Sequence, residues 1–283
     1  MPVDPATFDP AVLSPAAAAG DGEAAHRLAV LTAVGLGVPH DWLRALALLE
    51  QAARSGFAPA EAELALLAGP DGRIDLNRWL KPPPPRPVMS GPAIFAVEGF
   101  LAPAVCDWLR AKADPLMQPA MVYDPLTGAA RQETARTNRA APIDLTRMDV
   151  VTALVRERIA RLAGLPVPGL EWTQVLGYAV GQTFDWHYDW LDPSLPGYAA
   201  DLAARGQRIA TCLVYLNDDY EGGETAFEAG DLRWRGRRGD ALLWANTLPD
   251  GAIDRRTRHA GLPPTAGEKW VLSQWLRGRA PTV

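Results

Sequence analysis

Two side chains that can hold a metal ion lie two positions apart near the middle of the 283-residue chain, His187 and Asp189. In an extended strand, residues i and i+2 point to the same face, so this imidazole and carboxylate would project together. A second imidazole would complete a set of two histidines and one carboxylate, which holds non-haem Fe(II) and leaves positions open. Of the four histidines, only His259 follows this pair. The three residues are candidate ligands for Fe(II), or for zinc, which uses the same donors.

A lysine follows the third candidate ligand by ten residues, at the start of an apolar run with the pattern of a strand. Lysine is scarce, with three residues against 25 arginines. Strand alternation would place Lys269, Val271, Ser273 and Trp275 on one face. A buried ammonium needs an anionic partner to offset its desolvation. Lys269 is therefore a candidate for binding an anion, and a zinc hydrolase would offer no reason for it.

The tripeptide His187-Tyr188-Asp189 could arise by chance, as any short motif can. Its surroundings are more specific: Tyr178, Gly181-Gln182, Phe184, Arg208–Thr211, Tyr215–Asp218, Gly222–Thr225, Phe227, Gly239–Trp244, Arg258-His259 and Gly267–Trp270. Their order and spacing resemble the catalytic domain of the prolyl 4-hydroxylases, within the 2-oxoglutarate- and Fe(II)-dependent dioxygenases. The resemblance covers about residues 93–283 and is tightest over 171–277.

The resemblance implies a role for each matched residue. His187, Asp189 and His259 would bind Fe(II), and Lys269 would pair with the distal carboxylate of 2-oxoglutarate. It further implies hydroxyl groups of Tyr178 and Thr225 on that carboxylate, Trp275 lining the pocket, Arg208 near a peptide substrate, and Arg136-Thr137-Asn138 near the mouth of the site. A core role for Trp275 and a structural ion pair for Arg208 are the competing interpretations. Leu262-Pro263 departs from the Cys-Pro pair of many members and touches no ligand.

The activity expected from the resemblance is a procollagen-proline 4-dioxygenase-like hydroxylation of a prolyl residue in a peptide or protein. Succinate and CO2 would be released, and L-ascorbate is expected as a further cofactor. One alternative is a hydroxylase of a free amino acid or small molecule. Another is a nucleic-acid demethylase, supported only by the arginine run at 233–238, although such enzymes usually have Arg where Lys269 stands. A third is a protein-binding scaffold, which the intact set of site residues disfavours.

The elements that must position these residues change in type along the chain. A short strand is expected at 94–97, helices at 103–113 and 149–163, and a strand with apolar residues on both faces at 208–216. The second helix has a polar side formed by Arg156, Glu157 and Arg161. Several short strands and Gly-rich turns indicate a double-stranded β-helix, or jelly roll. The expected class is α+β, with helices flanking the catalytic jelly roll.

A small all-α segment is expected before the catalytic domain. Residues 1–22 have the composition of a loose lead-in, and helical patterns follow over about 24–68, with Asp41 as a helix cap. This part resembles a Sel-one-like repeat, a relative of the tetratricopeptide repeat. It would either bind a protein partner or stabilise the chain as a helical cap. The expected division is a repeat segment at 1–80, a Pro-rich linker at 81–92 and the dioxygenase domain at 93–283.

Composition is that of an ordinary globular protein, with 48% hydrophobic and 22% charged residues and a net charge of −5. This charge favours neither nucleic acid nor an anionic membrane as a partner. The first residues have no signal-peptide pattern, and no apolar run has the length of a membrane span. A cytoplasmic location is therefore expected. Cys106 and Cys212 lie in apolar segments and are expected to be buried thiols.

Overall fold

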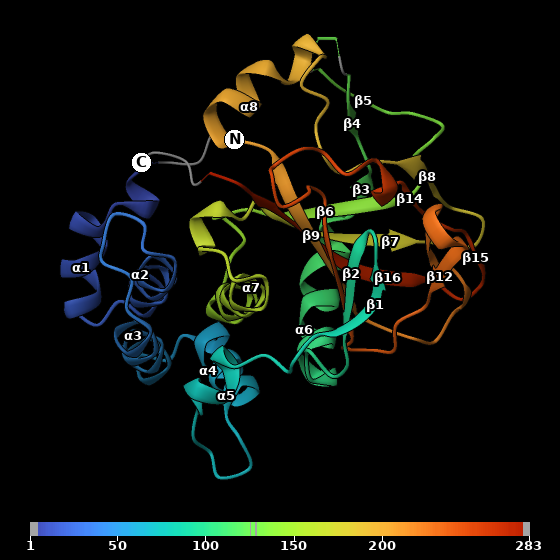
Figure 1. Cartoon of the computed structure of the whole chain (residues 1–283). Helices are drawn as coiled ribbons and strands as arrows, with labels where there is room; N and C mark the ends of the chain where they lie inside the picture. Colours follow the sequence, from blue (N-terminus) through green and yellow to red (C-terminus); the bar gives the residue numbers. More distant parts are fainter. Residues whose placement is uncertain (1–4, 125, 128, 280–283) are drawn as a thin grey trace. The chain divides into compact units, whose positions relative to one another are not determined.

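The computed structural model describes residues 5–124, 126–127 and 129–279, and the chain forms two compact units. One unit comprises Met1–Pro82 and Asp144–Arg161, and the other comprises Pro83–Ile143 and Leu162–Val283. The first unit is helical and the second contains the sheets (Figure 1). This division differs from the expected one, because a segment from the middle of the chain groups with the N-terminal helices.

The helical unit is built from short helices, several of which have an aspartate as N-cap. Its α-helices are α1 (Pro10–Ala18), α2 (Gly22–Val34), α3 (Trp42–Arg54), α4 (Ala58–Leu67), α5 (Leu76–Leu80) and most of α7 (Val150–Ala163), and a 3-10 turn spans Pro5–Phe8. Asp41 accepts a hydrogen bond from the Arg44 amide, as expected for a cap. The expectation of a loose lead-in was wrong, because Asp9 caps α1 in the same way and Leu13 is buried.

Buried charged groups tie α7 to the N-terminal helices. Glu63 on α4 is 1% exposed, lies 2.6 Å from His26 Nε2 and accepts a 2.8 Å hydrogen bond from the Val150 amide. Arg158 donates to the backbone carbonyls of Arg78 and Trp79. Arg156 and Glu157, on the polar side of this helix, are also buried, with exposures of 5% and 7%. Polar groups can be buried in this way when they gain partners.

The second unit is a jelly roll, which confirms the predicted fold class. Its larger sheet has the order β1 (Arg86–Ser90), β2 (Ala93–Val97), β13 (Ala241–Ala245), β9 (Arg208–Tyr215), β16 (Lys269–Arg277), β7 (Thr173–Tyr178), β6 (Arg139–Ile143) and β3 (Gln118–Pro119). Its smaller sheet has the order β12 (Leu232–Trp234), β11 (Thr225–Phe227), β14 (His259–Gly261) and β8 (Phe184–His187). Two ribbons pair β10 (Glu221–Gly222) with β15 (Pro264–Ala266), and β4 (Val122–Tyr123) with β5 (Ala130–Arg131). All these strand pairs are antiparallel.

Helices and short turns connect the strands of this unit. They are α6 (Pro103–Ala113), α8 (Ala199–Arg205) and 3-10 turns at Asp114–Leu116, Val167–Gly169, Pro196–Tyr198, Ala229–Asp231 and Arg255–Thr257. α6 packs against β6 and β7 (Figure 1). The expected linker at 81–92 is only partly a linker, because Arg86–Ser90 pairs with Ala93–Val97 as an edge strand. Prolines are tolerated at such an edge, where an amide need not donate.

The core between the sheets follows from strand alternation. Its buried members are Ile94, Ala96, Leu176, Tyr178, Leu213, Tyr215, Phe227, Leu242, Trp244 and Val271. On β9 and β16, inward-facing residues occupy every second position and pair across strands, such as Val271 with Tyr215. Cys106 and Cys212 are buried free thiols, as expected. In the described part of the chain, no helix is both long and apolar enough to cross a membrane.

Candidate functional site

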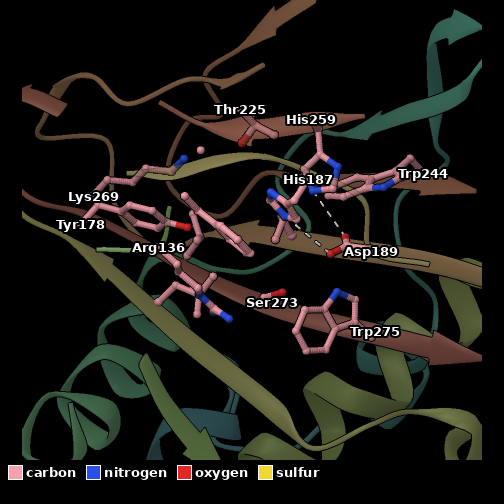
Figure 2. A pocket seen from close by; sticks show the side chains of 15 residues that line it. Arg136, Tyr178, His187, Asp189, Thr225, Trp244, His259, Lys269, Ser273 and Trp275 are labelled. Carbon is pink, nitrogen blue, oxygen red and sulfur yellow. Dashed lines mark ion pairs between the residues drawn. The ribbon is translucent and has the colours of Figure 1, made fainter. Parts of the chain in front are cut away.

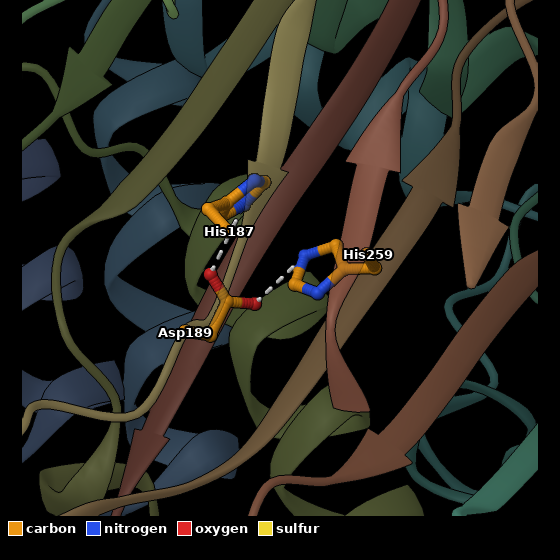
Figure 3. A group of neighbouring side chains, drawn as sticks. All are labelled: His187, Asp189 and His259. Carbon is orange, nitrogen blue, oxygen red and sulfur yellow. Dashed lines mark ion pairs between the residues drawn. The ribbon is translucent and has the colours of Figure 1, made fainter. Parts of the chain in front are cut away.

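His187, Asp189 and His259 meet at the smaller sheet (Figure 3). His187 ends β8, Asp189 follows two residues later, and His259 begins β14 directly opposite His187. The Nε2 atom of His187 lies 3.8 Å from Asp189 Oδ1, and that of His259 lies 3.5 Å from Asp189 Oδ2. One ligand atom from each residue lies within 4.8 Å of the other two. The spacing noted in the sequence thus brings together the three candidate metal ligands.

Both imidazole rings are held by their other nitrogen. His187 Nδ1 lies 2.6 Å from the Asp185 carbonyl oxygen, and His259 Nδ1 lies 2.9 Å from the Thr257 carbonyl oxygen. Because a carbonyl can only accept, each Nδ1 carries the proton and each Nε2 presents a lone pair. Second partners of this kind fix the tautomer and orientation of metal-binding histidines.

Electrostatics keep His187 and Asp189 in their metal-binding protonation states. Burial, together with the neighbouring His259, lowers the pKa of His187 to about 3, so this ring is neutral at physiological pH. Burial alone would raise the pKa of Asp189, but His259, His187 and the Thr211 hydroxyl bring it below its usual value. An ionised carboxylate and a neutral imidazole are the forms that bind metals.

Lys269 lies at the other end of the same pocket, which Figure 2 shows with Tyr178 and Thr225 nearby. Its side chain is 1% exposed, and its Nζ lies 5.2 Å from the centre of the Tyr178 ring and 5.7 Å from that of Tyr215. Among the described residues, no carboxylate forms an ion pair with this ammonium. Burial lowers the pKa of Lys269 to about 7. The Glu224 carboxylate acts in the opposite direction and offsets only part of this lowering. The site therefore presents a buried cation that an anionic ligand would complete.

Hydroxyl groups surround the space in front of Lys269. Tyr178 is the cross-strand partner of Lys269. Its ring packs on Gly261, and a larger residue at this position would place its Cβ atom 3.2 Å from the phenol oxygen. Thr225 Oγ1 lies 2.9 Å from the Tyr215 hydroxyl, and either oxygen can donate. The position of Tyr215 was missed in the sequence, although strand alternation from Leu213 places it on the inner face.

Trp275 lines the pocket, whereas Arg208 lies behind the Trp275 ring. Trp275 lines the pocket with Lys269, Val271 and Ser273 of the same strand. The Arg208 guanidinium lies 3.7 Å from the centre of the Trp275 ring and does not line the pocket itself. Arg208 donates to both carboxylate oxygens of Glu171 at 2.6 and 2.9 Å. The structure thus gives Arg208 the ion pair that was the competing interpretation for it.

Among the other side chains that line the pocket are Arg136, Phe184 and Trp244. The Arg136 guanidinium lies 4.4 Å above the Phe184 ring, and that ring stacks on His187 at 3.5 Å between centroids. Trp244 contacts His259 edge to face at 4.8 Å. The sequence contains these residues within recognisable motifs, but their contacts with the histidines depend on pairing between distant strands.

The donor set and the pocket fit Fe(II) together with 2-oxoglutarate. Two imidazole nitrogens and one carboxylate oxygen from the described residues leave coordination positions for other ligands. A dicarboxylate could reach from these positions towards Lys269, because His187, Asp189, His259 and Lys269 all line one pocket (Figure 2). The buried ammonium distinguishes this pocket from a metal site that needs no second anion.

Comparison with known proteins places this geometry in a family. Residues 173–277 match the model of the 2OG-Fe(II) oxygenase superfamily. Prolyl 4-hydroxylase 1 of Arabidopsis thaliana is 33% identical over 210 residues, which cover 69% of this chain and 72% of that protein. The prolyl 4-hydroxylase subunit alpha-1 of Rattus norvegicus is 34% identical over 189 residues, covering 66% of this chain and 35% of the subunit.

A solved structure agrees with these relatives. The viral collagen prolyl hydroxylase of Paramecium Bursaria Chlorella virus-1, in a complex with 2OG, matches with a TM-score of 0.50 and 25% sequence identity. The match covers 67% of this chain and 98% of the viral one. The matched region contains the three candidate metal ligands and most strands of the jelly roll. The chain belongs to the prolyl 4-hydroxylase family of 2-oxoglutarate- and Fe(II)-dependent dioxygenases.

Proposed function

We propose that this protein hydroxylates a prolyl residue in a peptide or protein, using Fe(II) and 2-oxoglutarate. The observation that supports this most is the buried Lys269 ammonium in one pocket with His187, Asp189 and His259. Bound Fe(II) and 2-oxoglutarate would supply the oxidising chemistry, in which O2 gives one oxygen atom to succinate and one to the substrate. CO2 is the remaining product.

Each residue has a distinct part in this proposal. His187, Asp189 and His259 hold the metal, with both histidines oriented through Nδ1. Lys269 neutralises the distal carboxylate of 2-oxoglutarate, and Tyr178 and Thr225 offer hydroxyl groups to it. Trp275 forms part of the pocket wall, and its ring contacts the Arg208 guanidinium.

Arg208 serves the substrate indirectly. Its guanidinium is already engaged by Glu171 on one side and by the Trp275 ring on the other. Its contribution to a peptide substrate would therefore be to hold Trp275 in place. The buried Arg208–Glu171 pair supports that role better than direct binding of a substrate anion.

The nucleic-acid alternative loses its main support. Arg238 pairs with Asp107, Arg235 donates to the Asp218 and Tyr220 carbonyls, and Arg233 lies 3.8 Å from Asp231. These local contacts engage three arginines of the run, which weakens the case for a phosphate-binding surface there. We therefore retain peptide hydroxylation as the proposed function.

We infer two accessory features from the resemblance. Ascorbate would keep the iron reduced when 2-oxoglutarate is consumed without a substrate. The helical unit would act as a Sel-one-like repeat segment that either binds a protein partner or stabilises the chain. Pull-down from lysate with the intact protein separates these roles, because only a binding module would retain a specific protein.

The activity is tested by measuring succinate from 2-oxoglutarate in the presence of Fe(II) and ascorbate. Parallel reactions contain a proline-rich peptide, free L-proline or a methylated oligonucleotide. We expect the peptide alone to stimulate succinate release, with an equal amount of product that is 16 Da heavier. Stimulation by L-proline or the oligonucleotide alone would contradict the proposal. If no chosen peptide reacts, a search for products that gain 16 Da in treated cell lysate identifies the substrate.

A further inference from the structure

Two hydrogen bonds run in series from Asn246 through Thr211 to the Asp189 carboxylate. Thr211 on β9 donates from Oγ1 to Asp189 Oδ2 at 2.7 Å. Asn246, which follows β13, donates from Nδ2 to Thr211 Oγ1 at 2.9 Å. All three side chains are buried, with exposures of 4% for Asp189, 1% for Thr211 and 0% for Asn246. The chain is therefore shielded from water.

The hydroxyl of Thr211 has one proton, and this determines which group donates in each of the two hydrogen bonds. A threonine hydroxyl has one proton to donate and can also accept. Because Asn246 donates to the hydroxyl oxygen, the hydroxyl proton is free to go to Asp189. The carboxylate oxygen that accepts it is also the one nearer to His259, at 3.5 Å from Nε2. Thr211 thus restricts rotation of the carboxylate at the point where the three candidate ligands meet.

The backbone holds both donors in register. Thr211 is the cross-strand partner of Trp244, and strand alternation puts Asn246 on the same side as Trp244. The Asn246 amide donates to the Ile209 carbonyl at 2.8 Å, and the Asn246 carbonyl accepts from the Asp254 amide at 2.9 Å. The loop that carries Asn246 is consequently anchored at both backbone groups.

The Asn246 side chain is not fully satisfied by this arrangement. Its Oδ1 atom is buried and has no hydrogen-bond partner among the described residues. In the described part of the chain, the Asn246 side chain forms its hydrogen bond with Thr211.

We propose that Thr211 and Asn246 are positioning residues, which fix the orientation of the Asp189 carboxylate for metal binding. The inference rests on the proposed metal site. Thr211 acts on the ligand directly and Asn246 acts through Thr211. Neither residue touches the metal or the substrate in this scheme. Outer partners of this kind change metal affinity by about 10- to 100-fold when removed.

The test compares metal affinity among full-length variants. Thr211→Val removes the hydroxyl and keeps the shape, whereas Thr211→Ser keeps the hydroxyl. Thr173→Val is the matched control, because Thr173 is equally buried and donates to Gln274 Oε1 at 2.7 Å, outside the residues that line the pocket. Co(II) binding to metal-free protein is titrated by calorimetry, and thermal unfolding of the metal-free protein is measured beside it.

We expect Thr211→Val to weaken Co(II) binding about 10- to 100-fold. Thr211→Ser should stay within about threefold of the unaltered protein, because its hydroxyl can make the same bond. Thr173→Val should lower the unfolding temperature and leave Co(II) affinity unchanged. A Thr211→Val protein that binds Co(II) as tightly as Thr173→Val would overturn the proposal.

A double-mutant cycle tests the order of the chain. If Asn246 acts through Thr211, the single variant Asn246→Ala weakens Co(II) binding. The double variant then binds Co(II) as weakly as Thr211→Val does. Additive losses would contradict the relay. His259→Ala separates this proposal from the metal assignment. Unchanged Co(II) binding in His259→Ala would refute the site itself, whereas lost binding there with unchanged binding in Thr211→Val would refute only the positioning role.

Discussion

Lys269 on β16 and Tyr178 on β7 are direct cross-strand partners, and the ammonium lies 5.2 Å from the centre of the phenol ring. Both side chains face the pocket that contains the metal-binding set. The phenol hydroxyl and the ammonium can therefore address the same bound anion. Burial raises the pKa of Tyr178 to about 12, so this hydroxyl remains a donor across the physiological range.

Replacing Lys269 should impair co-substrate binding without affecting the metal. A hydrogen bond to a charged group contributes about 1.5–3 kcal/mol. Lys269→Ala should therefore raise the KM for 2-oxoglutarate at least about tenfold, since each 1.4 kcal/mol is a factor of ten. Lys269→Arg should recover part of the loss, because a planar guanidinium does not replace an ammonium.

The measurement is 2-oxoglutarate titration with succinate detection, beside metal analysis of the same samples. Lys81→Ala is the control, because Lys81 is exposed and distant in sequence from the site. An unchanged KM in Lys269→Ala would mean that the co-substrate is bound elsewhere.

The affinity for 2-oxoglutarate should depend on pH through Lys269. Its pKa in the ligand-free protein is lowered to about 7 by burial, so the group is charged below pH 7 and neutral above it. A bound carboxylate favours the charged form and raises this pKa, so binding above pH 7 must take up a proton. The KM should therefore rise by up to about tenfold per pH unit above 7 and level off below it.

Initial rates between pH 6 and 8.5, each with a full 2-oxoglutarate titration, measure this dependence. Lys269→Arg is the control, because a guanidinium stays charged over this interval. A KM for the unaltered protein that is constant from pH 6 to 8.5 would rule out the linkage.

Removing one imidazole should abolish metal binding and turnover together. His259→Ala leaves His187 and Asp189, which are too few ligands to hold Fe(II) in the proposed arrangement. Metal analysis should show loss of bound iron, and succinate formation should fall to background. His40→Ala is the control, since its ring is 44% exposed and lies 3.8 Å from Glu157 in the helical unit. Full turnover by His259→Ala would contradict the assignment.

Glu63 should contribute to the stability of the helical unit. It is 1% exposed and serves both His26 and the Val150 amide, so Glu63→Ala leaves a buried amide without a partner. Such a loss costs about 1–3 kcal/mol. Denaturant unfolding should detect it, and Glu61→Ala, at an exposed position of the same helix, should cost less. Equal losses in both variants would argue against a special role for Glu63.

The site was predictable where chemistry follows from local spacing. The i, i+2 relation of His187 and Asp189, and the inward alternation of Lys269 and Trp275, depend only on extended backbone. The scarcity of lysine in the sequence was a second reason to identify Lys269 as a candidate anion-binding residue. Prolyl 4-hydroxylase motifs then supported the jelly roll, which the structure confirms.

Features that depend on distant pairing were not predictable. The Arg208–Glu171 pair and the Tyr215–Thr225 contact each require strands that meet only in the folded sheets. The burial of Arg156 and Glu157 on α7 was also missed, because periodicity assigns charged residues to solvent unless a partner is known. The edge strand at Arg86–Ser90 was hidden by its prolines.

The direct pairing of His187 with His259 has a consequence for biosynthesis. Everything from Tyr188 to Arg258 must be made before these two strands can join, so the three candidate ligands cannot capture iron together until His259 has been synthesised. Closing such a long loop is entropically costly and favours slow assembly. Metal loading is thus a late event, and the appearance of bound iron would mark the joining of these two strands during folding.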